Sequence, residues 1–174
     1  MSERSDRTSQ RSTRVGAVAL TLVVASVLLF GACGPDYSQC PARGSGQVRV
    51  AVVVDARALG GTTSVVCVVV ASGSTGATAL RARATRLGTA APRYNSGGLL
   101  CAIDGRPASP ACGNQGPNGY EYWSYWLGGS SWRYASVGPA GRTVQDQAVD
   151  GWRFLKGGGA VPPNTSSSFA TLTS

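Results

Sequence analysis

Apolar and polar positions divide the chain into a long apolar run near its start, several short strands and one amphipathic helix. Residues 15–32 carry no charge and follow a polar, arginine-containing segment. Further along, residues 47–55 and 62–70 are valine-rich, and the turn between them contains Gly60-Gly61. Such runs joined by a glycine turn predict a β-hairpin. Their long apolar stretches indicate burial on more than one side.

The pattern predicts one helix, over residues 74–87. Ser74 or Thr75 can cap its start, and Gly88 is a natural stop. Apolar side chains recur at spacings of three and four, so they share one face, with the arginines mainly on the other side. The positions on this apolar face are Ala77, Leu80, Ala84 and Leu87.

Further strands are expected after the helix. They cover residues 93–95 (a short edge strand), 99–103 (a buried strand ended by Asp104-Gly105), 119–127, 131–135 and 151–155. The third and fourth of these are separated by a glycine turn and predict a second hairpin. One helix packed on a small mixed sheet is an α+β arrangement. A hairpin, then a helix, then more strands resembles the β-grasp plan.

We divide the chain into an export leader or anchor (1–33), a tether (34–46), a β-grasp-like domain (47–156) and a disordered low-complexity tail (157–174). The apolar run would extend roughly 27 Å as a helix, just short of a bilayer core. A basic start, an apolar stretch and small residues at its end are typical of an export signal. The run ends in Phe30-Gly31-Ala32-Cys33, which resembles a bacterial lipobox with Cys33 as the lipidated residue. An uncut membrane anchor and ordinary signal cleavage remain alternatives, and all three place the rest of the chain outside the cytoplasm.

Composition excludes several kinds of chemistry. The chain has 174 residues and no histidine, so imidazole cannot serve as a base, a nucleophile's partner or a metal ligand. The formal net charge is +8, but charged residues make up only 14% of the chain. After the leader, 12 basic and 6 acidic residues remain, which indicates a solvated, mildly basic surface rather than a nucleic-acid partner.

The cysteine count is compatible with a lipidated residue. If Cys33 is modified, four of the 5 cysteines remain, an even number for an oxidising compartment. We favour Cys40–Cys67 and Cys101–Cys112 among the three possible connectivities. The first bridge would pin the N-terminal arm to a strand, and the second would close a short loop around an Asp-Gly turn. Metal binding is disfavoured because the chain lacks a Cys-x-x-Cys pair.

Aromatic residues gather near the end of the domain, where all 4 tryptophans occur. Two interpretations stay open: a platform for a flat ligand, a sugar ring or a corrin, or simply the core of a small sheet. The candidate ligand-binding residues are Tyr122, Trp123, Tyr125, Trp126, Trp132 and Tyr134. Asp104 and Asp150 each precede a glycine and are interpreted as turn residues rather than a catalytic acid pair. With no catalytic residue identified, we do not expect an enzyme, a metal or a resident cofactor.

The motifs C-A-I-D-G (101–105), Y-W-S-Y-W (122–126) and D-G-W-R-F (150–154) resemble a family of actinobacterial exported proteins. The chain more distantly resembles the C-terminal domain of transcobalamin. These resemblances imply a β-grasp-like fold and a binding role. The actinobacterial family tends to be encoded beside energy-coupling-factor transporter components, which implies an accessory role in vitamin uptake. In transcobalamin this domain covers one face of the corrin together with a large helical domain that is absent here.

The resulting functional hypothesis is a non-enzymatic, extracytoplasmic protein attached to the membrane. It would capture a corrinoid-type ligand for an uptake transporter. The alternatives are a glycan-binding module of the cell envelope, which would use the same rings as a sugar platform, and a structural surface protein.

Overall fold

A computed structural model describes residues 36–109 and 112–174. The predicted export leader and Cys33 lie outside these residues. The elements, in chain order, are β1 (Gln47–Asp55), η1 (Arg57–Leu59), β2 (Thr63–Ala71), α1 (Gly76–Leu87), β3 (Arg93–Tyr94), β4 (Leu100–Ala102), β5 (Asn114–Gly116), β6 (Gly119–Leu127), β7 (Arg133–Tyr134), η2 (Pro139–Gly141), β8 (Ala148–Lys156) and α2 (Phe169–Leu172). Among the described residues, no helix is both long and apolar enough to cross a bilayer.

The main sheet is mixed and carries one helix of more than four residues among the described elements, which confirms the predicted α+β class. Its strands run β2-β1-β8-β6-β5, and β7 pairs with β6. The first hairpin, β1 with β2, is antiparallel, whereas β1 and β8 pair in parallel at the centre. The valines of β1 are buried on both faces of the sheet, because α1 packs on one face and α2 on the other, as their continuous apolar run indicated.

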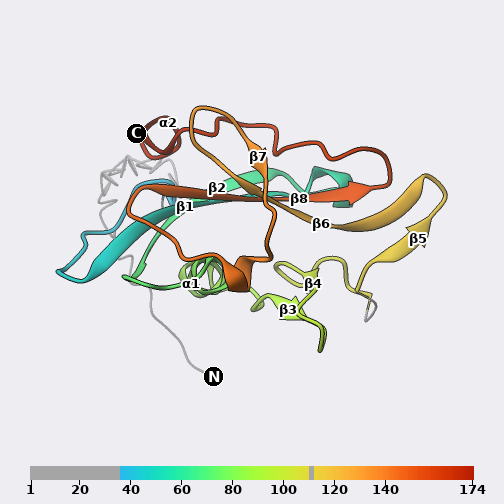
Figure 1. The fold of residues 1–174 in the computed structure, drawn as a ribbon, viewed down its shortest axis with the longest axis horizontal. Helices are drawn as coiled ribbons and strands as arrows, with labels where there is room; N and C mark the ends of the chain where they lie inside the picture. The colour runs from blue at the N-terminus through green and yellow to red at the C-terminus, as the bar shows by residue number, and fades with distance from the viewer. Residues whose placement is uncertain (1–35, 110–111) are drawn as a thin grey trace, which may run out of the picture. The chain divides into compact units, whose positions relative to one another are not determined.

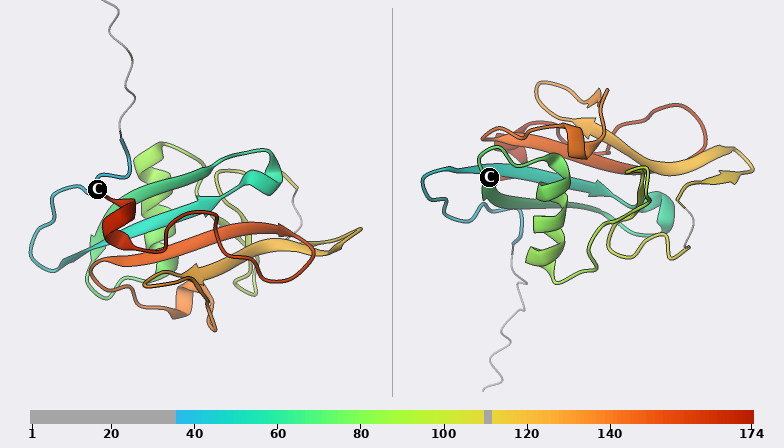
Figure 2. Two further views of the ribbon diagram at one scale, coloured as in Figure 1. Left: turned by 90° about the horizontal axis from the view of Figure 1, so that it is seen from above. Right: turned by 60° about the horizontal axis from the view of Figure 1, so that its bottom comes forward.

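Figure 1 shows the sheet nearly edge-on, with α1, β3 and β4 on one side and the C-terminal segment with α2 on the other. In Figure 2, α1 crosses the face of the strands opposite α2. The larger core cluster fills the space between α1 and the sheet, and includes Val50, Leu80, Trp123 and Trp152. A smaller cluster on the opposite face joins Ala51, Val53 and Val149 to Leu172 of α2.

Helix α1 begins and ends as predicted but buries a different set of side chains. Thr75 caps its start by accepting a hydrogen bond from the Thr78 backbone, and Gly88 ends it in a left-handed conformation. Leu80 and Ala84 are buried as expected, yet Arg83 is also buried, at 2% exposure. The prediction that the arginines lie mainly away from the core is therefore wrong for Arg83. Its guanidinium is paired with Asp104, which makes burial of the charge tolerable.

Two of the later strands also differ from prediction. The predicted strands at 93–95 and 99–103 form a separate two-stranded sheet, β3 with β4, instead of joining the main one. The last strand begins at Ala148, three residues before the predicted start, so Asp150 lies inside β8. In β8, Asp150 lies opposite Val52 of β1 and Leu127 of β6, and it is fully buried. Its interpretation as a turn residue is therefore wrong.

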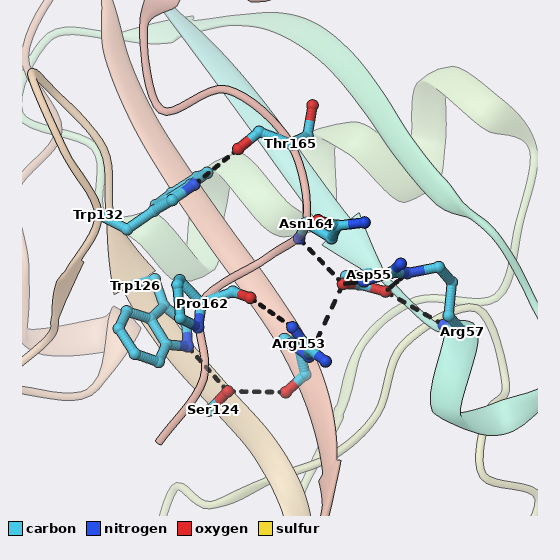
Figure 3. Close-up of polar contacts among 9 residues, drawn as sticks. All are labelled: Asp55, Arg57, Ser124, Trp126, Trp132, Arg153, Pro162, Asn164 and Thr165. Carbon is cyan, nitrogen blue, oxygen red and sulfur yellow. Dashed lines mark hydrogen bonds and ion pairs between the residues drawn. The ribbon is translucent and has the colours of Figure 1, made fainter. Parts of the chain in front are cut away.

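Residues 157–174, predicted to be a disordered tail, instead pack on the sheet. Hydrogen bonds that involve backbone groups and the apolar packing of Phe169 and Leu172 both hold the segment, and its low overall apolar content did not reveal either. Arg153 donates to the Pro162 carbonyl at 2.6 Å, and the Asn164 N–H donates to Asp55 at 3.1 Å. Figure 3 shows this segment lying across β8 with both contacts in place. The packed domain therefore extends beyond its predicted end at residue 156.

Both disulfides favoured by the sequence are present. Cys40–Cys67 joins the N-terminal arm to β2, and Cys101–Cys112 closes the loop after β4. The arm is also held by a hydrogen bond from the Cys67 N–H to the Tyr37 carbonyl. The described part of the predicted tether, from residue 36 onward, is therefore attached to the domain rather than free of it.

Candidate ligand-binding site

The six predicted aromatic residues do not form one continuous surface, because alternate residues of β6 point to opposite faces of the sheet. Trp123 and Tyr125 point toward α1 and belong to the main core, with 4% and 7% exposure. Trp123 meets Phe154 edge-on at 5.4 Å, and Tyr125 stacks on Trp152 at 4.9 Å. These two rings therefore stabilise the core and offer only their edges to a ligand.

Trp126 and Trp132 occupy the opposite face, beneath the C-terminal segment. Trp126 is buried, and its indole N–H donates to the Ser124 hydroxyl at 2.9 Å. Trp132 is half-buried, and its indole N–H donates to the Thr165 carbonyl at 3.0 Å. Figure 3 shows both indoles beside the segment that contains Pro162 and Thr165. A ligand could reach these faces only if residues 162–165 moved.

Gly151 permits this packing. A Cβ at this position of β8 would lie 2.6 Å from a ring carbon of Trp132 and 3.0 Å from Pro163. The absence of a side chain on Gly151 lets the indole lie directly on the strand. The glycine before Trp152 in the D-G-W-R-F motif therefore has a packing role, whereas the sequence suggested a turn.

Tyr122 is half-buried, like Trp132, and Tyr134 is the exposed member of the predicted set. The hydroxyl oxygens of Tyr122 and Tyr134 lie 3.3 Å apart, and Tyr134 is 47% exposed. Tyr134 also meets Trp126 edge-on at 5.1 Å, which holds its ring in place. Partial burial, together with the hydrogen bond to Tyr122, raises the pKa of Tyr134 to about 12, so the Tyr134 phenol is neutral near pH 7.

These tyrosines border a cavity of about 270 Å³ that we call the aromatic pocket. Its wall combines rings of β6 with the loops before β4 and after β7. The lining includes Leu99, Tyr122, Trp123, Tyr125, Tyr134, Val137, Pro139 and Trp152. Leu99, Tyr134 and Val137 are among the most exposed large apolar side chains, at 36%, 47% and 50%. An exposed apolar rim above aromatic walls is typical of a ligand site.

Sequence reasoning missed the two aliphatic residues of this rim. Leu99 follows the Ser96-Gly97-Gly98 turn and was assigned to a buried strand, although the strand begins only at Leu100. Val137 lies between Ala135 and the η2 turn in a segment that had no periodic pattern. An apolar residue directly after a glycine turn was the available signal for Leu99, while nothing in the pattern singled out Val137.

A buried polar cluster supports the inner end of the aromatic pocket. The Tyr125 hydroxyl donates to Asp150 at 2.6 Å, and Arg142 pairs with the same carboxylate at 3.2 Å. Burial raises the pKa of Asp150, against the opposing effects of Tyr125 and Arg142. Helix α1 approaches closely here: a Cβ on Gly76 would lie 2.5 Å from the Tyr125 hydroxyl. The cluster fixes the Tyr125 ring and thereby one wall of the pocket.

The described residues contain no group of three or more Cys, Asp or Glu side chains placed to hold a metal ion. Asp104 and Asp150, weighed as an acid pair, belong to different ion pairs, with Arg83 and Arg142 respectively. The aromatic pocket offers a ligand aromatic surface, the hydroxyls of Tyr122 and Tyr134, and an apolar rim.

Comparisons with known proteins agree with this architecture. The model of the SCO2322-like domain matches residues 115–174, which include the aromatic strand and the C-terminal segment. Among solved structures, haptocorrin in complex with Cbi is similar with a TM-score of 0.50 and 19% identity. The match covers 67% of this chain but 27% of haptocorrin, so the chain corresponds to about a quarter of that protein. At this identity the similarity concerns the fold. No curated protein matches the sequence significantly.

Proposed function

We propose that this chain is a non-enzymatic capture protein, exported and held at the outer side of the cell membrane, that presents a flat ring ligand to an uptake transporter. The aromatic pocket carries the proposal. Its exposed apolar rim would be costly to leave in water unless something covered it, and its aromatic edges suit a planar partner.

A corrinoid is the ligand class we favour. The structure to which the fold is similar was solved with Cbi, and a flat macrocycle can lie across Leu99, Tyr134 and Val137 at the pocket mouth. The chain corresponds to only 27% of haptocorrin, so we propose that it covers one face of the ligand. A transporter component would then cover the other face, and the chain alone would bind weakly.

Titration calorimetry with Cbi tests the ligand assignment. We expect Tyr134→Ala to weaken binding by about tenfold, roughly 1.4 kcal/mol, because it removes a stacking ring from the rim. Tyr120→Ala is the matched control, since Tyr120 has the same exposure of 47% but does not line the pocket. Equal losses in both variants, or no binding by the unmodified protein, would contradict a corrinoid site here. Binding of purified peptidoglycan in place of Cbi would favour the glycan alternative.

Membrane attachment needs a separate measurement. Mass spectrometry of the protein extracted from host membranes should show a diacylglyceryl modification on Cys33, and Cys33→Ser should release the protein from the membrane fraction. A Cys33→Ser protein that stays in the membrane at full length would instead indicate an uncut anchor. An unmodified, soluble wild-type protein would contradict attachment altogether.

A further inference from the structure

A polar cavity of about 490 Å³, which we call the arginine pocket, lies outside the site described above. Its walls come from the turn between η1 and β2, the C-terminal end of α1 and the turn after β4. Its polar lining includes Thr62, Ser64, Arg83, Thr89, Asp104 and Arg106. Trp123 lines both this cavity and the aromatic pocket.

A buried ion pair forms the rigid floor of the arginine pocket. Arg83 donates to both carboxylate oxygens of Asp104, at 2.8 and 2.9 Å, and to the Ser64 hydroxyl at 2.9 Å. The Thr89 hydroxyl donates to the same carboxylate at 2.6 Å. The ion pair joins α1 to the turn after β4, and it leaves Asp104 partly exposed, at 26%, as an acceptor for ligand hydroxyls.

The backbone fixes the position of Arg106. Ile103 and Arg106 exchange two backbone hydrogen bonds, at 2.9 and 2.8 Å, around Asp104 and Gly105. These two central residues have φ of 52° and 73°, which is the geometry of a type I′ turn and explains the Asp-Gly sequence. The Arg106 carbonyl also accepts the Trp123 indole N–H at 3.1 Å. Arg106 is therefore held on a rigid loop at the edge of the pocket.

The Arg106 guanidinium is the cation available to a ligand. The Arg106 guanidinium extends to the turn at Gly61. A Cβ added at Gly61 would lie 3.4 Å from the Nη1 atom of Arg106. Among the described residues, no ion pair joins it to an acidic side chain. With Arg83 and Arg106 against Asp104, the lining has one positive charge in excess.

We propose that the arginine pocket binds a small hydroxylated anion of the sugar-acid or sugar-phosphate class. A guanidinium binds carboxylate and phosphate groups through two parallel hydrogen bonds. The anionic group pairs with Arg106. The ligand hydroxyls bond to Asp104, Ser64 and Thr62, which line the same cavity. This site is independent of the proposed corrinoid capture, because Tyr134 and the apolar rim take no part in it.

Calorimetric titration of the full chain tests the proposal. The probes are glucuronate, glucose 6-phosphate, glucose and inorganic phosphate, each at 0.15 M salt. We expect at least one anionic sugar to bind about tenfold more tightly than both glucose and inorganic phosphate. Binding of glucuronate would identify the anionic group as a carboxylate, and binding of glucose 6-phosphate would identify it as a phosphate. Arg106→Gln should reduce this binding about tenfold, and Gly61→Val should also reduce it by narrowing the mouth. Arg133→Gln, which removes an exposed charge on β7, is the control and should change binding less than about twofold.

Three results would overturn the proposal. The first is that neither anionic sugar binds more tightly than glucose. The second is that inorganic phosphate binds as tightly as the sugars, which would remove the role of the hydroxyl contacts. The third is an equal loss in Arg106→Gln and Arg133→Gln, which would indicate attraction to the overall positive charge. Circular dichroism of Arg106→Gln should match the unmodified protein, because the turn depends on its backbone.

Discussion

Replacing Asp55 with asparagine should weaken both the fold and the attachment of the C-terminal segment. Asp55 ends β1, is 1% exposed, and accepts hydrogen bonds from Arg57 at 2.9 Å and from the Asn164 N–H at 3.1 Å. Arg153 lies 3.8 Å from the same carboxylate. Figure 3 shows these groups converging on Asp55 from η1, β8 and the C-terminal segment. An asparagine would turn an amide N–H₂ toward donors that now face a carboxylate oxygen.

The magnitude follows from the pKa of this carboxyl group. Burial acts to raise the pKa of Asp55, but the hydrogen bonds from Arg57 and Asn164 outweigh it and lower the pKa from 3.8 to about 2. This difference corresponds to about 2 kcal/mol of stability. Because the folded-state pKa is lowered, this stabilisation is present above pH 3.8 and is lost as the pH falls toward 2.

Urea denaturation at a series of pH values measures the effect. At pH 7 we expect Asp55→Asn to lower the free energy of unfolding by about 2 kcal/mol. The difference from the unmodified protein should shrink toward zero as the pH approaches 2. Hydrogen exchange at residues 162–165 should be faster in the variant. Asp36→Asn is the control, since Asp36 is exposed and accepts its hydrogen bonds from nearby Ser38. A loss at pH 7 that is below about 0.5 kcal/mol, or equal at pH 7 and pH 2.5, would refute this reasoning.

Three further changes test the packing. Gly151→Val should displace Trp132 and destabilise the protein by about 1–3 kcal/mol. The measurements are a red shift of tryptophan emission and a lower urea midpoint. An unchanged emission spectrum would contradict the close contact between Gly151 and Trp132. Leu172→Ala should lower the free energy of unfolding by about 2–3 kcal/mol in urea denaturation, because Leu172 is 7% exposed in the smaller core cluster with Ala51, Val53 and Val149. A neutral effect would show that α2 is not docked on the sheet. Replacing Cys40 and Cys67 by serine should cost about 3–4 kcal/mol in the chain-entropy model, since the bridge spans 27 residues; equal urea midpoints with and without the bridge would refute this.

Sequence patterns predicted those elements that depend on their own residues or on the residues at their ends. Alternating and continuous valine runs predicted the first hairpin, and Thr75 and Gly88 marked the ends of α1. The Asp104-Gly105 pair predicted a tight turn because only residues that tolerate positive φ fit there. The parity of the cysteines and their spacing favoured the two bridges that the structure contains.

The features that the sequence did not predict depend on contacts between distant segments. Arg83 follows Leu80 by three positions, so helical spacing places it on the buried face, but only the position of Asp104 makes its burial favourable. The C-terminal segment is held by hydrogen bonds that involve backbone groups and by a few apolar side chains, so its overall composition gave little signal. Burial of Trp126 depends on this segment, which lies on the same side of β6. Half of the aromatic surface predicted from residue type is therefore packed inside the protein.

Heteronuclear NMR of the ¹⁵N-labelled domain during titration with Cbi tests the central claim most directly. The account predicts that shift changes concentrate on the rim of the aromatic pocket, at residues 98–99 and 134–138 and at Tyr122. Resonances of the arginine pocket near Arg106 and of the exposed Tyr120 should change little. An absence of shift changes at saturating Cbi, or changes spread evenly over the basic surface, would contradict the assignment of this pocket as the capture site.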